Sequence, residues 1–375
     1  MAFRFLHSAD LHIGKPFGNL PEDLRGRLRE ARHGLIARLA ERARSGGAGT
    51  ILLAGDSFDT ETPSPAILRQ ALAAIGQEAD IRWIILPGNH DSLQAEELWR
   101  RIGEAAPPNL HLATSPHPFT LAPGVTLLPA PGTTRRPGRD LTEWMDGAET
   151  PDGALRIGLA HGPVLDFSES GTAASVIAPD RARRAGLDYL ALGDWHGPMA
   201  LDLRTRYPGT PEPDRFKHDA PGTALLVTIE GPGAPPEITA VPTAQFSWTS
   251  IGFDPLLEGS DPDALLSRLP QPAFRRTALV RLVLSGHLSL GQRNGLVAAL
   301  DVVAPEFALF ETDETGLSIA CEPGDLDRID RAGALREAAQ TLLAESEDPL
   351  LSLAERETSR AALVRLFTLA ERAGA

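Results

Sequence analysis

The sequence is short of several features that would place a protein in a particular class. It has a single cysteine, Cys321, which excludes an internal disulfide framework. It has no apolar run long enough to cross a membrane. Its first residues, MAFRFLHSAD, lack the basic region, long apolar core and cleavage site of a signal peptide. We therefore expect a cytoplasmic protein that makes no use of a membrane.

Basic residues are scarce relative to acidic ones. There are 36 Lys and Arg residues against 50 Asp and Glu residues, and the formal net charge is −14. Because nucleic-acid binding usually rests on Lys and Arg neutralising phosphates, this chain alone is expected to bind DNA weakly. A nucleic-acid enzyme is not excluded, because divalent cations and a partner can supply positive charge.

The first half of the chain alternates expected strands with expected helices. Strands are predicted from continuous apolar stretches and helices from apolar residues at helical spacing. The expected strands are 3–9, 50–55, 81–88, 124–130, 155–161 and 187–194, and the expected helices are 21–44, 65–76 and about 176–185. This alternation is typical of an α/β fold.

The second half of the chain predicts smaller modules. The expected elements are strands at 223–230 and 237–250, a strand–helix–strand module at 276–286, 291–303 and 307–320, and two helices after 325. We expect three domains: 1–250, a small α/β cap at 251–324, and a helical tail at 325–375. The last helix has Leu363, Phe367 and Ala370 on one face. That face could pack on its own domain, but docking of a partner is the preferred interpretation.

Five of the expected strands end in small polar clusters. They are Asp10-Leu11-His12, Gly55-Asp56, Gly88-Asn89-His90-Asp91, His161-Gly162 and Gly193-Asp194-Trp195-His196. In open α/β sheets, sites assemble at the carboxyl ends of strands. A single cluster is easily explained as a turn, but five in succession are not. Carboxylate, imidazole and amide groups together suit Mn²⁺, Fe²⁺ or Zn²⁺ better than Mg²⁺ or Ca²⁺ alone.

The order of these clusters resembles the calcineurin-type metallophosphoesterases. Within that superfamily, SADLHIGKPF, GDSFD, LPGNHD and YPGTPEPDRF are similar to the SbcD-like and YhaO-like DNA repair exonucleases, over about residues 1–215. The resemblance implies a four-layer α/β/β/α sandwich with two divalent metal ions, Mn²⁺ first among Mg²⁺, Fe²⁺ and Zn²⁺. It further implies a DNA exonuclease or endonuclease, a homodimer, and an SbcC-like or YhaN-like ATPase partner with long coiled coils.

The resemblance also implies a role for individual residues. One metal ion is held by Asp10, His12 and His196, the other is held by Asn89, His161 and residue 194, and both are bridged by Asp56. His90 is implied to act over the scissile phosphate as a transition-state stabiliser or general acid, with Asp91 orienting it. A histidine near such a site is chemically suited to proton donation near neutral pH. Weaker candidates for substrate contact are Tyr207 and Trp195, and Asp59 is a further weak candidate beside the ligands.

The last cluster departs from the family pattern, because Asp194 stands where a histidine is expected. Three interpretations remain open. Asp194 replaces the histidine as a ligand, since carboxylates bind the same metals through oxygen. Alternatively, its shorter side chain fails to reach and the second metal is weakened or lost. In the third interpretation, Asp194 only caps a turn.

Two other functions fit the same sequence. A phosphodiesterase or phosphatase for a small molecule would have an identical metal cluster, because that cluster contacts only the phosphate group of the substrate. A non-catalytic scaffold that binds DNA ends or a partner is favoured only by Asp194, and His90 argues against it. His7 lies in the middle of a strand and is expected to be a core residue rather than a ligand.

Overall fold

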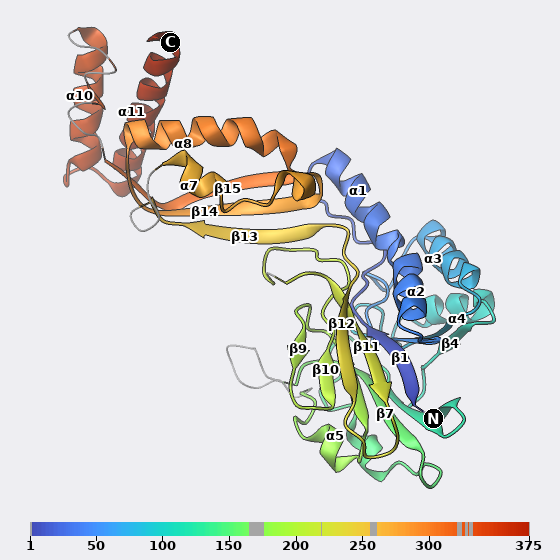
Figure 1. The fold of residues 1–375 in the computed structure, drawn as a ribbon. Helices are drawn as coiled ribbons and strands as arrows, with labels where there is room; N and C mark the ends of the chain where they lie inside the picture. The colour runs from blue at the N-terminus through green and yellow to red at the C-terminus, as the bar shows by residue number, and fades with distance from the viewer. Residues whose placement is uncertain are drawn as a thin grey trace. The chain divides into compact units, whose positions relative to one another are not determined.

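The computed structural model describes residues 2–164, 176–218, 220–255, 261–320, 325–326, 329 and 333–374 (Figure 1). Cys321 lies outside the described residues. The chain divides into two compact units, Met1–Trp248 and Thr249–Ala375. The separation of a helical tail at 325–375 from the cap stays a prediction. Within the described part, no helix is both long enough and apolar enough to cross a membrane.

The first unit contains two six-stranded sheets. The strand order of the first is β12 (Glu237–Pro242), β11 (Thr223–Ile229), β1 (Phe3–Ser8), β2 (Thr50–Leu53), β3 (Arg82–Ile85) and β4 (Leu110–Leu112). The order of the second is β5 (Phe119–Ala122), β6 (Val125–Ala130), β7 (Leu155–His161), β8 (Tyr189–Gly193), β10 (Thr205–Tyr207) and β9 (Met199–Ala200). The strands β1 to β4 are parallel to one another, as are β6, β7, β8 and β10.

Helices cover the outer face of each sheet. The helices of this unit are α1 (Glu22–His33), α2 (Leu35–Ser45), α3 (Pro65–Gln77), α4 (Glu96–Ala105), η1 (Glu143–Gly147) and α5 (Arg181–Arg184). Alternate residues of a strand point to opposite faces of its sheet. Phe5 therefore packs between the two sheets, and Leu6 packs against α2 and its neighbours. Tyr189 likewise faces the core between the sheets, while Leu190 packs with η1 and α5. The expected α/β/β/α layering is confirmed.

Three predicted elements differ from the structure. The helix expected at 21–44 is divided at Gly34 into α1 and α2, in keeping with the weak helix propensity of glycine. The helix expected near 176–185 is confined to the four residues of α5. The strand expected at 237–250 is two strands, β12 and β13 (Ser247–Phe253), which belong to different sheets. The first of them ends at Pro242, which has no amide hydrogen to continue a ladder.

The second unit is built on a three-stranded sheet in the order β13, β14, β15. Its elements after β13 are α7 (Pro262–Leu266), η2 (Pro272–Thr277), β14 (Ala278–Ser289), α8 (Leu290–Val303), η3 (Ala304–Glu306), β15 (Leu309–Ala320), α10 (Ala334–Glu347) and α11 (Leu353–Gly374). Because β14 and β15 are parallel and joined through α8, the expected strand–helix–strand module is confirmed.

The apolar face of the last helix lies inside this unit, so its predicted use for docking is wrong. Leu363 and Phe367 are 2% and 0% exposed. They pack in one cluster with Leu290 at the start of α8 and Ala339 of α10. Sequence periodicity identified the apolar face, but what covers that face depends on tertiary packing.

His7 joins the two sheets of the first unit in the middle of their shared core. The ring of this β1 residue is fully buried, with Nδ1 3.0 Å from the Tyr189 hydroxyl and Nε2 3.2 Å from the Leu192 carbonyl of β8. Since a carbonyl only accepts, Nε2–H donates to Leu192 and Nδ1 accepts from Tyr189. Burial lowers the pKa of His7 to about 3, although the bond to the Leu192 carbonyl opposes this. The expectation that His7 is a core residue is confirmed.

We expect the burial of His7 to lower the free energy of unfolding as the pH falls. Between about pH 6.5 and 3 the unfolded chain binds a proton at His7 and the folded chain does not, so stability rises with pH in that window. Denaturant unfolding in EDTA should therefore show a loss between pH 7 and 5 that is about 2 kcal/mol larger in the wild type than in His7→Gln.

The exposed His117 provides the matched control, because His117→Gln should keep the wild-type dependence. Identical pH dependence in the wild type and His7→Gln would show that His7 takes up a proton over the same pH range in the folded chain as in the unfolded chain.

Candidate metal centre

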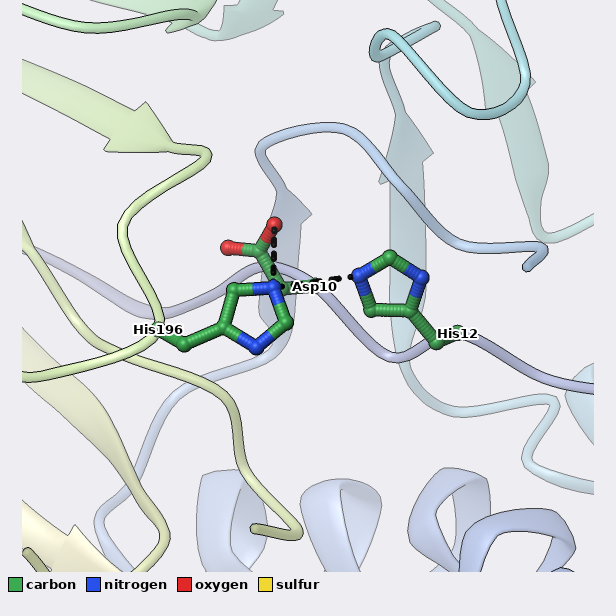
Figure 2. Close-up of side chains that lie close together, drawn as sticks. All are labelled: Asp10, His12 and His196. Atoms are coloured by element: carbon green, nitrogen blue, oxygen red, sulfur yellow. Dashed lines mark hydrogen bonds and ion pairs between the residues drawn. The ribbon is translucent and has the colours of Figure 1, made fainter. Parts of the chain in front are cut away.

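The loops that follow β1, β2, β3, β7 and β8 bring the predicted ligands together. Three groups of side chains have ligand atoms within 4.8 Å of one another: Asp10, His12 and His196; Asp10, Asp56 and His161; and His12, Asp56 and His90. Figure 2 shows the first group, in which the two imidazoles face each other beside the carboxylate of Asp10. The Nε2 atoms of His12 and His196 are 3.3 Å apart. Residues from both sheets thus meet at one edge of the sandwich.

The backbone at these positions adopts a rarely populated conformation. Among the described residues, the non-glycine residues with positive φ are Asp10 (56°), His12 (44°), Phe17 (52°), Asp56 (51°) and Asp194 (105°). All except Phe17 are predicted ligands. Such conformations are costly for side chains with a Cβ and gather at functional sites. The fold therefore holds four ligand positions in place at the expense of local backbone energy.

Asp56 occupies the centre of the cluster. Its Oδ1 accepts hydrogen bonds from the backbone N–H groups of Asn89 and His90, both at 2.8 Å. The same oxygen is 3.5 Å from His161 Nε2, and Oδ2 is 3.7 Å from His12 Nε2. One carboxylate oxygen thus faces each predicted ion position, as a bridging ligand requires.

Asp194 points toward the two other residues predicted to share its ion. Its Oδ1 is 2.8 Å from Asn89 Nδ2 and 3.7 Å from His161 Nε2. This placement favours the interpretation of Asp194 as a ligand over that of a turn cap. Its backbone N–H donates to the Asp10 carboxylate at 3.1 Å, which ties the β8 loop to the β1 loop.

The buried donor atoms of the site have the chemistry that a metal ion requires. His161 Nδ1 donates to the Ala54 carbonyl at 2.8 Å, which leaves Nε2 as a lone-pair donor. That Nε2 is buried and has no hydrogen-bond partner among the described residues. Buried polar atoms without partners are uncommon and call for an explanation such as an ion. The donor set of carboxylates and imidazoles fits divalent transition metals.

Two glycines are required for His161 to reach this position. A Cβ added to Gly55, which has a φ of 89°, would lie 2.3 Å from His161 Nδ1. A Cβ on Gly193 would lie 2.9 Å from the same nitrogen and 2.0 Å from the Ala54 carbonyl oxygen. Gly55, in the loop after β2, and Gly193, the last residue of β8, therefore provide the space that the imidazole occupies.

The site carries an excess of negative charge. Burial raises the pKa of Asp10 to about 6, with His196 and His161 opposing the rise and Asp56 adding to it. Burial disfavours protonation of His161, but the carboxylates of Asp56, Asp10 and Asp194 outweigh it and raise its pKa to about 9. Both pKa values are raised, as expected where carboxylates lie close together without enough positive charge. Divalent cations would relieve that repulsion.

The structure corrects the predicted role of Asp91. Its carboxylate accepts from the backbone N–H groups of Gly88 at 2.7 Å and Phe58 at 3.1 Å, and it is fully buried. His90 is held instead through Nδ1, which lies 2.9 Å from the Asp59 carbonyl. Burial raises the pKa of Asp91 to about 7, with the charge of Asp56 adding to the rise. Asp91 therefore braces the loops and does not orient the His90 ring, because its side chain turns back into the loop.

The two weaker substrate candidates have different surroundings. Tyr207 is 3% exposed, and its hydroxyl donates to the Gly162 carbonyl at 2.7 Å. This burial argues against the predicted substrate contact, and Tyr207 instead fixes the loop after His161. Trp195 is partly buried, and its ring centroid is 4.8 Å from that of His218.

Sequence reasoning named Asp59, which lies behind His12, as a weak candidate, but it missed the residue behind His196. Asp214 is buried, and its carboxylate lies 3.4 Å from His196 Nδ1 and 2.8 Å from Lys15 Nζ. Burial would raise its pKa, but the bond to His196 and the charge of Arg32 hold it well below the usual range. The motif YPGTPEPDRF contains Asp214, yet Asp-Arg in a turn-rich loop gives no signal of such a contact.

Comparison with known proteins identifies the family. A model of the calcineurin-like phosphoesterases matches residues 3–198, which include every predicted ligand. The uncharacterized metallophosphoesterase YhaO of Bacillus subtilis (strain 168) is 29% identical over 239 residues, or 60% of this chain. This chain thus spans 57% of the length of that relative. Among solved structures, TT1561 of Thermus thermophilus is 12% identical with a TM-score of 0.41, and the match covers 64% of this chain and 99% of TT1561.

We expect Asp194→Ala to lower bound metal from two ions per chain to about one, because it removes a carboxylate that lies close to both the Asn89 side chain and the His161 ring. The measurement is elemental analysis after equilibrium dialysis against Mn²⁺. Asp180→Ala is the control, since it removes a carboxylate from an exposed ion pair with Arg183. Two ions per chain in Asp194→Ala would contradict its assignment as a ligand.

Proposed function

The chain belongs to the calcineurin-like phosphoesterase family, and we propose that it is a metal-dependent phosphoester hydrolase whose substrate is the phosphodiester backbone of DNA. The reaction is hydrolysis of a diester at a centre that holds two divalent ions. In our proposal it acts in DNA repair in the cytoplasm, as an exonuclease or endonuclease.

The proposed ligands form two sets, one for each ion position. We assign the first position to Asp10, His12 and His196, whose ligand atoms lie within 4.8 Å of one another. We assign the second to Asn89, His161 and Asp194, because Asp194 lies close to both other side chains. Asp56 lies between them, near His12 and His161. Bound ions supply Lewis-acid stabilisation of the attacking and leaving oxygens during in-line displacement. Mn²⁺ is the proposed metal because the donors combine carboxylate oxygen with imidazole nitrogen.

His90 is the proposed general acid or transition-state stabiliser. Its Nδ1–H faces the carbonyl of Asp59, which can only accept, so Nε2 is the nitrogen that exchanges a proton with substrate. The His90 ring is partly exposed and lies edge-on to that of His12, with centroids 4.8 Å apart. The ring of His90 therefore lies beside the first ion position.

The observation that carries the DNA assignment is the group of cationic and aromatic side chains beside His196. Lys217 Nζ lies 5.7 Å from the centre of the Trp195 ring, and Arg215 forms an ion pair with the buried Asp214 at 3.0 Å. Arg215 and Lys217 are both exposed. Cations that track phosphates and aromatic rings that stack on bases are the usual features of single-stranded nucleic-acid grooves.

A partner would explain how so acidic a chain engages DNA. With a net charge of −14, long-range attraction of a polyanion has to come from elsewhere. We propose a homodimer that assembles with a coiled-coil ATPase of the SbcC-like or YhaN-like kind. The connection between α10 and α11 offers exposed apolar side chains for such a contact, because Leu350 and Leu353 are 91% and 65% exposed.

The proposal predicts nuclease activity that depends on His90. Wild-type protein should degrade end-labelled linear DNA in Mn²⁺, and His90→Ala should lower the rate at least about 100-fold, the usual contribution of general acid catalysis. His117→Ala is the control, since it removes an exposed histidine from the same unit. Chelation with EDTA should abolish activity in every variant.

The same assay separates the rival functions. Hydrolysis of bis(p-nitrophenyl) phosphate without degradation of single- or double-stranded DNA, with the ATPase present, would favour a small-molecule diesterase. Turnover of neither substrate by protein that binds two ions would favour a scaffold.

A further inference from the structure

The imidazoles of the first ion position are each backed by a carboxylate. His12 Nδ1 lies 3.2 Å from Asp59 Oδ1, and His196 Nδ1 lies 3.4 Å from Asp214 Oδ1. In both rings the nitrogen that faces away from the carboxylate is Nε2, and these two Nε2 atoms are 3.3 Å apart. Asp214 accepts a hydrogen bond from His196 Nδ1–H, which leaves the lone pair on Nε2. Asp59 lies beside His12 Nδ1, but this nitrogen makes no hydrogen bond among the described residues, so Asp59 acts on His12 through its charge.

Cationic side chains surround these carboxylates. Lys15 Nζ lies between them, 2.8 Å from Asp214 Oδ2 and 3.8 Å from Asp59 Oδ1. Arg32 is fully buried, and its guanidinium is 3.7 Å from the same Asp214 oxygen. Arg32 also donates to the Leu11 carbonyl, between the ligands Asp10 and His12. Arg215 also pairs with Asp214, with its Nε 3.0 Å from Oδ1. These cations favour the ionised form of both carboxylates, although the carboxylates are mostly buried.

The second ion position lacks this arrangement among the described residues. His161 Nδ1 faces the neutral carbonyl of Ala54 at 2.8 Å, and the carboxylates near this ring, Asp56 and Asp194, face its Nε2. Either partner behind a ligating imidazole fixes its orientation, and a charged carboxylate raises its basicity more than a neutral backbone carbonyl does.

We propose that Asp59 and Asp214 are positioning residues that make the ion position of Asp10, His12 and His196 the tighter of the two. This inference rests on the two-ion centre proposed above. Lys15 and Arg32 serve the same position indirectly, because they neutralise Asp59 and Asp214.

The test is a calorimetric Mn²⁺ titration of the full chain, resolved into two binding constants. Asp59→Asn and Asp214→Asn keep the size of each side chain and an acceptor oxygen but remove the charge. Each should weaken the tighter constant about 10- to 100-fold and leave the weaker one within about threefold, as is typical for outer carboxylates behind metal-bound histidines. Asp80→Asn is the matched control, since it breaks only a surface pair with Arg44.

A second pair of variants assigns the effect to one ion. In Asp194→Ala, which is expected to keep only the tighter ion, adding Asp214→Asn should weaken that ion by the same factor. A general loss of structure would weaken both constants in the wild-type background. If Asp214→Asn does not fold, Asp59→Asn carries the test, because its side chain is more exposed, at 14% against 1%.

The outcomes separate this inference from the proposed function. A wild-type chain that binds fewer than two ions would overturn the two-ion centre, and the inference with it. Two ions in the wild type, with unchanged constants in Asp59→Asn and Asp214→Asn, would overturn the inference alone. Equal weakening of both constants would also overturn it, because the carboxylates back only His12 and His196.

Discussion

The centre depends on the face-to-face packing of two largely parallel sheets. Because parallel strands end at a common edge, β1, β2 and β3 of one sheet and β7 and β8 of the other bring their loops to the same place. Leu52 and Leu159 lie in the core that holds the sheets together, a few residues before Asp56 and His161. The apolar packing between the sheets thus sets the distances among polar groups, and the positive φ values are the local cost of turning each chain toward the centre.

Charge is the second constraint. Carboxylates gather at this edge in numbers that the nearby histidines do not neutralise, and burial increases the cost of each one. Two sets of carboxylates are compensated in different ways. The outer carboxylates of Asp59 and Asp214 are compensated by Lys15 and Arg32. The inner carboxylates of Asp10, Asp56 and Asp194 have no such fixed cation in the described contacts, and they are the ones we assign to metal ions. With ions bound there, the same division would allow an acidic protein to hold the phosphate of its proposed substrate.

The sequence predicted this centre well where function follows local pattern. An apolar strand followed by glycine and then aspartate or histidine can be recognised from the sequence alone. The resemblance to a family then assigned each candidate ligand to one of two ion positions. Prediction failed where a role depends on distant contacts. Asp91 adjoins His90 in sequence, but its side chain is bonded to the backbone of Gly88 and Phe58. Leu363 and Phe367 show the right periodicity, yet periodicity does not say that α8 and α10 cover them. Nothing near Asp214 in the sequence reveals its contact with Arg32.

The central claim is that two ions are bound side by side, with Asp56 between them and Asp194 on the second. The most direct measurement is anomalous X-ray diffraction at the manganese edge from crystals grown with Mn²⁺. Our account predicts two peaks, one beside Asp10, His12 and His196 and one beside Asn89, His161 and Asp194, with Asp56 contacting both. A single peak, or a second peak that the Asp194 carboxylate does not contact, would contradict it.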